Sequence, residues 1–182
     1  MKSLLVTGGA ASGKSRFAVS YFKGCDRVLY LKSGTGTDKL TLNRIKADTE
    51  KYNVEWDTVL SDKLTPADEI GNHKFVIFDS LSSFTRLALR QISPTEVMMD
   101  LDANTKQDTE KRMIEAIDGV FEKVEQNNGN LVIITVETGF SLVPEDSFIA
   151  AYREILGRVN QRVANKVNEV YFSASGVQFK IK

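Results

Sequence analysis

Short apolar runs alternate with amphipathic stretches along this chain, and the alternation predicts strands and helices in turn. The apolar runs predict strands at Ser3–Thr7, Arg27–Leu31, Val54–Leu60, Lys74–Asp79 and Leu131–Val136. Apolar residues at helical spacing predict helices at Ser15–Lys23, Asp38–Tyr52, Ser80–Gln91, Asn104–Asn127 and Pro144–Val163. Strands that alternate with helices indicate an α/β fold, with a mostly parallel sheet and helices on both of its faces.

The end of the chain departs from this alternation. Two strand-like runs, Glu169–Ser173 and Val177–Ile181, flank Ala174-Ser175-Gly176, and this predicts an antiparallel hairpin that closes the sheet. A further helix is expected to start at Ser93-Pro94-Thr95-Glu96, with proline at its first position. The chain has no internal repeat or proline-rich linker, so we expect residues 1–182 to form a single P-loop nucleotide-binding domain.

Composition and charge narrow the class of protein. Lys plus Arg and Asp plus Glu each number 24, and a balanced chain lacks the basic footprint that nucleic acid as a main partner would require. Cys25 is the one cysteine, so no intrachain disulfide forms and a reducing compartment is expected. The apolar run at the N-terminus is too short for a signal peptide, and no window reaches the length of a membrane span. We therefore expect a cytoplasmic protein.

The most specific motif follows the first predicted strand directly. It has the pattern G-x-x-x-x-G-K-S and reads Gly8, Gly9, Ala10, Ala11, Ser12, Gly13, Lys14 and Ser15. In such a loop the backbone N–H groups and the next helix N-terminus face phosphate oxygens. Lys14 reaches the β- and γ-phosphates, and the Ser15 hydroxyl is a ligand for Mg²⁺. The loop therefore predicts binding of a nucleoside triphosphate; the alternative is a glycine-rich turn with an incidental Lys-Ser.

Two acids stand at the ends of apolar strands, where ligands bind in open α/β sheets. Asp79 is predicted to hold Mg²⁺ with Ser15, and the alternative is a helix N-cap. Glu137 is predicted to orient the acceptor hydroxyl or to hold a metal-bound water, and the alternative is a surface acid. The catalytic candidates are thus Lys14, Asp79 and Glu137, and the segment from Gly139 to Pro144 is expected to border a substrate pocket.

One helix carries a cluster of polar residues: Arg153, Arg158, Asn160, Gln161 and Arg162. Arginine side chains suit phosphate and carboxylate recognition, so these residues are candidates for substrate binding or for a subunit contact. The alternative is a solvated helix face. The one histidine, His73, precedes a strand and is interpreted as a turn residue rather than a catalyst.

Several of these motifs together resemble the adenosylcobinamide kinase/adenosylcobinamide-phosphate guanylyltransferase family of cobalamin biosynthesis. The similarity runs from end to end of the chain. It rests on Leu5–Arg16, Arg44-Ile45, Trp56-x-Thr58, Val136-Glu137-x-Gly139, Val143-Pro144-Glu145, Gly157-Arg158-Val159-Asn160-Gln161-Arg162 with Arg153, and the C-terminal Ser175-Gly176 and Lys180-Ile181-Lys182. The resemblance implies a RecA-like P-loop fold, ATP or GTP with Mg²⁺, a cobinamide substrate, and a homo-oligomer, a trimer, with active sites near subunit contacts.

The chain departs from this family at one position. Guanylyl transfer in the family proceeds through a histidine shortly after the Arg-Ile pair, in a pattern like R-I-x-x-H. Here Lys46, Ala47, Asp48 and Thr49 follow Arg44-Ile45, and His73 comes 28 residues after Ile45. We therefore expect a cobinamide-type kinase without that histidine route. The alternatives are a P-loop NTPase or kinase for another small alcohol, and a nucleotide-binding relative that does not catalyse.

Overall fold

Seven strands form one sheet in this computed structural model, which describes residues 1–34, 39–92, 101–140, 142 and 144–182. The strands are β1 (Lys2–Gly8), β2 (Val28–Ser33), β3 (Trp56–Ser61), β4 (Phe75–Asp79), β5 (Asn130–Ile134), β6 (Glu169–Ala174) and β7 (Val177–Lys180). Their order across the sheet is β3-β2-β4-β5-β1-β6-β7. All neighbouring pairs are parallel except β6 and β7, which are antiparallel.

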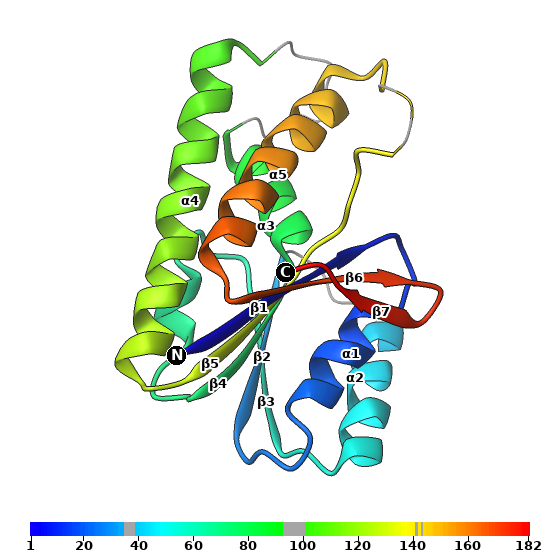
Figure 1. The fold of residues 1–182 in the computed structure, drawn as a ribbon. Helices are drawn as coiled ribbons and strands as arrows, with labels where there is room; N and C mark the ends of the chain where they lie inside the picture. The colour runs from blue at the N-terminus through cyan, green and yellow to red at the C-terminus, as the bar shows by residue number, and fades with distance from the viewer. Residues whose placement is uncertain (35–38, 93–100, 141, 143) are drawn as a thin grey trace.

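Helices cover both faces of this sheet (Figure 1). They are α1 (Lys14–Tyr21), α2 (Lys39–Tyr52), α3 (Leu81–Ile92), α4 (Ala103–Gln126) and α5 (Ser147–Lys166), with a short 3₁₀ helix at Pro66–Glu69. Helices α1 and α2 pack on one face, and α3, α4 and α5 pack on the other. Strands buried on both faces are typical of parallel sheets, and this explains why the central strands read as unbroken apolar runs.

The predicted mostly parallel sheet, its helices on both faces and the C-terminal hairpin are confirmed, and the arrangement is that of a RecA-like P-loop fold. Several boundaries differ from the prediction. Strand β2 runs two residues beyond Leu31, because its pairing with β3 and β4 continues through Lys32. Strand β5 ends two residues before Val136, and α5 begins at Ser147 rather than at Pro144. The 3₁₀ helix was not predicted, and the helix expected at 93–96 lies outside the described residues.

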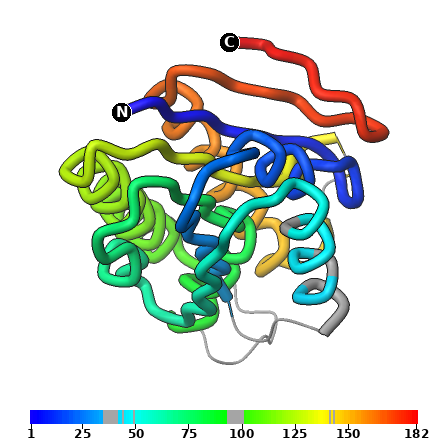
Figure 2. The backbone as a smooth tube through the Cα atoms, turned by 90° about the horizontal axis from the view of Figure 1, so that it is seen from below, coloured from blue at the N-terminus to red at the C-terminus, as the bar shows by residue number. Residues whose placement is uncertain are grey.

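Parallel pairing brings the carboxyl ends of β1, β2, β4 and β5 to one edge of the sheet. The phosphate-loop sequence follows β1, Asp79 ends β4, and Glu137 follows β5 at this same edge. The C-terminal hairpin lies alongside β1 at the end of the sheet (Figure 2). The topology therefore gathers residues that are more than 120 positions apart in sequence. Among the helices that the structure describes, none is long and apolar enough to cross a membrane.

Candidate nucleotide-binding site

The segment Gly8–Ser15 forms the turn between β1 and the first residues of α1. Gly8 has φ +141° and Gly13 has φ +99°, which are backbone conformations that side chains rarely adopt. A Cβ atom on Gly8 would lie 2.2 Å from the carbonyl oxygen of Ser173 in β6. Glycine at position 8 is therefore required by close approach of the backbone as well as by the turn.

Lys14 lies over this loop and is only 8% exposed. Its ammonium donates to the carbonyl oxygen of Gly8 at 3.0 Å, to that of Gly9 at 2.5 Å and to Ser12 Oγ at 3.4 Å. Burial lowers the pKa of Lys14, and the negative charge of Asp79 opposes that shift. Three oxygens of the loop itself thus hold the Lys14 ammonium.

The C-terminal hairpin supports the other side of the loop. Ser173 Oγ donates to the carbonyl oxygen of Ser12 at 2.7 Å, and the Gly176 backbone N–H donates to the same oxygen at 2.9 Å. Gln178 Nε2 in turn donates to Ser173 Oγ at 3.2 Å. Because Ser12 is in the middle of the loop, these bonds fix the loop from a segment 160 residues away.

Asp79 is buried at the end of β4, next to β2. Its Oδ2 accepts from the Tyr30 hydroxyl at 2.5 Å and from Lys32 Nζ at 3.2 Å. The N-cap of α3 is the neighbouring Ser80, whose Oγ accepts from the Ser83 backbone N–H at 3.2 Å. The cap is thus supplied by Ser80, and the Asp79 carboxylate faces the residues of β2.

Glu137 is three residues beyond the end of β5 and is half-buried. Its backbone N–H donates to the carbonyl oxygen of Gly8 at 3.4 Å, and its Oε1 accepts from the Gly139 N–H at 3.0 Å. The first bond places Glu137 beside the start of the phosphate loop. The second folds the carboxylate onto the segment that follows it.

The polar residues predicted on the helix α5 separate into different environments. Asn160 is buried, where its Oδ1 accepts from Thr135 Oγ1 at 2.7 Å and its Nδ2 donates to the Val136 carbonyl at 3.0 Å. Arg153 donates to the carbonyl oxygens of Gly139 at 2.9 Å and Leu142 at 2.7 Å. Both side chains therefore hold the segment that follows β5.

The other three residues of this cluster do not approach the phosphate loop. Arg158 pairs with Glu110 of α4 at 2.5 Å and with Glu154 of its own helix at 2.6 Å. Arg162 lines a small cavity between α4 and α5, and Gln161 is exposed. Within the motif Gly157–Arg162, Asn160 is therefore buried, whereas Arg158 faces α4 and Gln161 faces solvent.

His73 lies at the opposite edge of the sheet, just before β4 begins. Its Nε2 is 2.6 Å from Asp57 Oδ2, and its Nδ1 is 2.8 Å from the Ile70 carbonyl oxygen. Five strand residues, about 17 Å at roughly 3.3 Å each, separate it from the edge that carries the phosphate loop. The position agrees with the interpretation of His73 as a turn residue.

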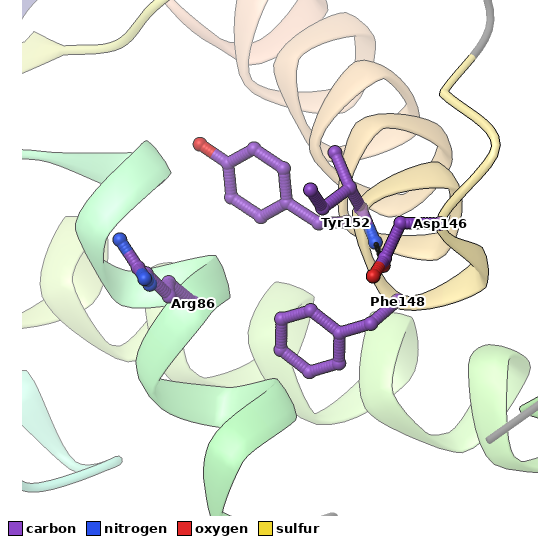
Figure 3. A pocket seen from close by; sticks show the side chains of 5 residues that line it. Arg86, Asp146, Phe148 and Tyr152 are labelled. Atoms are coloured by element: carbon purple, nitrogen blue, oxygen red, sulfur yellow. Dashed lines mark hydrogen bonds between the residues drawn. The ribbon is translucent and has the colours of Figure 1, made fainter. Parts of the chain in front are cut away.

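A cavity of about 340 Å³ lies between α3 and the start of α5 (Figure 3). Arg86 lines it from α3, and Asp146, Phe148, Ile149 and Tyr152 line it from α5 and its N-cap. Burial raises the pKa of the Tyr152 phenol, whereas the positive charge of Arg86 and a hydrogen bond with Ser82 lower it. Ser82 Oγ is 2.7 Å from Ser80 Oγ, so hydroxyl groups connect the cavity to the residue that follows Asp79.

Sequence reasoning did not single out Tyr30, Lys32, Ser173 or Gln178 as parts of the site. Lys32 carried one signal, since it is a charged residue at the end of an apolar run. The predicted strand ended one residue before it, and its partner Asp79 is identified only by the register of β2 against β4. Ser173 carried no signal, because only the packing of the hairpin places it against Ser12.

The sequence is similar to those of known proteins over nearly its whole length. The profile of the family described as "Cobinamide kinase / cobinamide phosphate guanyltransferase" matches residues 4–181. The chain belongs to this family. It is 31% identical over 183 residues to the bifunctional adenosylcobalamin biosynthesis protein CobU of Escherichia coli (strain K12), covering 98% of this chain and 99% of that protein. The protein of the same name from Salmonella typhimurium is 28% identical over 188 residues, with the same coverage. The members of this family are enzymes of cobalamin biosynthesis.

Two of the solved structures with a similar fold are ATPases of type III secretion systems. One is a prototypical ATPase from pathogenic bacteria, with TM-score 0.55 and 11% identity over 94% of this chain. Another is EscN from enteropathogenic E. coli, also with TM-score 0.55 and 11% identity, over 96% of this chain. The chain spans 50% and 43% of their lengths. At this identity the likeness shows the P-loop ATPase fold alone.

Proposed function

We propose that this member of the cobinamide kinase family transfers the γ-phosphoryl group of ATP or GTP to the aminopropanol hydroxyl of cobinamide. The observation that supports the proposal is the meeting of three predicted catalytic residues at one edge of the sheet. Lys14 lies over the phosphate loop, Asp79 is close enough for its charge to act on Lys14, and Glu137 is bonded to Gly8. Phosphoryl transfer asks the protein mainly for positioning and for charge stabilisation, and these residue types supply both.

In this proposal the phosphate loop first binds the triphosphate of the nucleotide. Residues Gly8–Ser15 present backbone N–H groups and the N-terminus of α1 to the phosphates. Lys14 exchanges the Gly8 and Gly9 carbonyls for β- and γ-phosphate oxygens, which carry more negative charge than the carbonyls do. Glu137 then orients the acceptor hydroxyl for in-line attack on the γ-phosphorus and takes its proton. As the new O–P bond forms, the bond from the γ-phosphorus to the β-phosphate oxygen breaks and ADP or GDP leaves.

The donor atoms at this edge suit Mg²⁺. Within the described ranges, no group of three His, Cys, Asp or Glu side chains is placed to hold a metal ion. Mg²⁺ is commonly held by one or two protein oxygens together with waters and phosphate oxygens, and the Asp79 carboxylate and the Ser15 hydroxyl are ligands of that kind. When bound there, Mg²⁺ would neutralise charge on the phosphate oxygens.

The position of His73 bears on the second activity in the family's description. A histidine intermediate needs the imidazole within bonding distance of the α-phosphate, and the chain has one histidine. That residue is paired with Asp57 at the opposite edge of the sheet. We propose that this chain does not carry guanylyl groups on histidine, so the kinase reaction is the one that its site supports.

The cavity between α3 and α5 is our candidate for the acceptor subsite. It lies at the start of α5, and its lining comes from Arg86 and from Asp146 onward rather than from the described residues of the segment Gly139–Pro144, whose role as a pocket border stays a prediction. Phe148 and Ile149 give this cavity an apolar lining, and Arg86 and Tyr152 add polar groups. At about 340 Å³ it has room for one amide-bearing arm of an amphiphilic molecule and not for its whole ring. A Phe148→Ala variant should raise the KM for the corrinoid and leave nucleotide affinity unchanged.

The assay that tests the proposal uses γ-labelled ATP or GTP, Mg²⁺ and cobinamide, and follows label into the corrinoid. Lys14→Ala should abolish transfer, and Lys23→Ala, at an exposed lysine after α1, should not. Label that appears as free phosphate at the same rate without cobinamide would indicate an NTPase. A protein that binds nucleotide but transfers no label to cobinamide would contradict the proposed acceptor.

A parallel incubation with α-labelled GTP tests the absence of a histidine route. We expect no acid-labile label on the protein. Stable GMP on the chain would overturn that part of the proposal, and mass spectrometry would then locate it. The homotrimer, the single domain and the cytoplasmic location stay predictions, of which sedimentation equilibrium tests the first.

A further inference from the structure

A second lysine is paired with Asp79, the acid predicted to act at the phosphate site. Strands β2 and β4 are parallel neighbours, and their register places Lys32 opposite Asp79. Lys32 Nζ is 3.2 Å from Asp79 Oδ2. Alternation along β2 puts Lys32 on the same face as Tyr30, which packs in the cluster beneath α1. The pair therefore lies on the side of the sheet where the phosphate loop enters α1.

The Asp79 carboxylate already has two donors on one oxygen. Both Lys32 Nζ and the Tyr30 hydroxyl donate to Oδ2. The Lys32 and Asp79 side chains are 19% and 6% exposed, so this ion pair is largely removed from solvent. Tyr30 is fully buried and donates to the same oxygen, so Asp79 keeps one buried donor when Lys32 leaves it.

The Lys14 ammonium, like that of Lys32, is bonded to oxygens of the protein. An ammonium has three N–H donors, and Lys14 directs its donors to Gly8 O, Gly9 O and Ser12 Oγ. Both ammonium groups are therefore held by oxygens of the protein. Phosphate oxygens form stronger charge-assisted hydrogen bonds than neutral carbonyls do, and a γ-phosphoryl group carries more charge than a shared carboxylate oxygen. A triphosphate at this edge therefore offers better acceptors to both lysines.

We propose that Lys32 is a second phosphate-binding lysine of the site. In the absence of nucleotide it neutralises Asp79, and when a triphosphate binds it exchanges that carboxylate for oxygens of the γ-phosphoryl group. The inference rests on the proposed function and goes further by assigning the contact to the γ-group. The loop and Lys14 serve the β- and γ-phosphates, whereas Lys32 approaches from β2, beyond Asp79. Lys32 therefore makes the site favour triphosphates over diphosphates.

The test compares the affinities of a non-hydrolysable ATP analogue and of ADP, by calorimetry with Mg²⁺ present. Lys32→Met keeps an unbranched side chain and removes the charge. It should weaken the triphosphate analogue by about tenfold or more, the effect of losing one charge-assisted hydrogen bond, and should change ADP by less than about threefold. Lys32→Arg should retain most of the preference for triphosphate.

Two further variants keep the result interpretable. Lys32→Gln retains a hydrogen-bond donor for Asp79 without the charge, so it tests the same loss in a protein whose carboxylate stays paired. Lys23→Met, at an exposed position, is the matched control and should leave both affinities unchanged. Urea unfolding of each variant shows whether the fold is retained.

The outcomes separate this inference from the proposed function. If Lys32→Met and Lys32→Gln weaken both ligands equally, or neither, Lys32 has a structural role and the inference is wrong. If the unsubstituted protein binds no nucleotide, or if Lys14→Ala binds as well as the unsubstituted protein, the proposed function itself fails. Selective loss of the triphosphate in both variants, with Lys14→Ala losing both ligands, supports the inference.

Discussion

Replacing Asn160 by alanine tests what the polar motif on α5 does. The side chain is 8% exposed and joins α5 to the end of β5 through two hydrogen bonds, with Thr135 Oγ1 at 2.7 Å and the Val136 carbonyl at 3.0 Å. Thr135 is itself fully buried. Alanine would leave a buried hydroxyl and a carbonyl without this partner.

The expected cost follows from these two groups. A buried polar group that loses its partner costs about 1–3 kcal/mol. The two groups together are expected to cost about 3 kcal/mol, in the lower half of the summed range, because the Val136 carbonyl is only part-buried. For a chain of this length that free energy corresponds to a fall in Tm of about 6–12 °C. Urea unfolding should show the loss as a lower midpoint with an unchanged m-value, because the surface exposed on unfolding is unchanged.

The neighbouring residue provides the control. Gln161 is exposed, so Gln161→Ala should change stability by less than about 0.5 kcal/mol. In a Thr135→Val background, Asn160→Ala should cost about 1 kcal/mol less than it does alone, since one of its bonds is then already gone. Unchanged stability with a large rise in KM for cobinamide would refute this reasoning and place Asn160 in contact with substrate.

Three further predictions concern Gly157 in α5, Ser173 in β6 and Lys14 in the loop. Gly157 is in α5 with open space around its Cα, so Gly157→Ala should raise the free energy of unfolding by about 0.5–1 kcal/mol in urea titrations; a loss of stability would indicate an unrecognised contact. Ser173→Ala removes one donor to the Ser12 carbonyl and should weaken nucleotide binding by about 3–10-fold, the value of about 1 kcal/mol, as fluorescent-nucleotide titration would show; equal affinity would mean that Gly176 suffices to hold the loop. Burial lowers the pKa of Lys14 from its ordinary 10.5, so the ammonium is lost as the pH rises through this lowered pKa, and the alkaline limb of kcat/KM should have its midpoint below pH 10.5; a profile flat to that pH would contradict the assignment.

Local sequence was sufficient to predict most elements of the fold. The central strands are apolar runs that end at turn residues, and the long helix α4 repeats buried positions at helical intervals, from Met113 to Val124. Element ends were less predictable. Lys32 extends β2 although it is charged, because its ammonium finds Asp79 on the neighbouring strand, and that neighbour is not visible along the chain.

The candidate site shows the same division. The phosphate loop is contiguous and its glycines have backbone requirements that any sequence with this turn must meet, so it was recognisable from eight residues. The sequence did not predict which residues of the polar cluster on α5 are buried and which are exposed. Its members are adjacent in sequence, yet successive positions on a helix point in different directions, and so Asn160 is buried beneath β5 while Gln161 is exposed and Arg158 faces α4.

The sequence by itself determined that this protein has an α/β fold, that a phosphate loop ending in a Lys-Ser pair follows the first strand, and that its one histidine is at position 73, away from that loop. Only the tertiary structure decided which residues stand beside that loop. Parallel pairing aligns the carboxyl ends of strands that are far apart in sequence, and it thereby brings Lys32 to Asp79 and Glu137 to Gly8, while the packed hairpin brings Ser173 to Ser12. These contacts depend on strand order and register, which are properties of the assembled sheet and of no single segment.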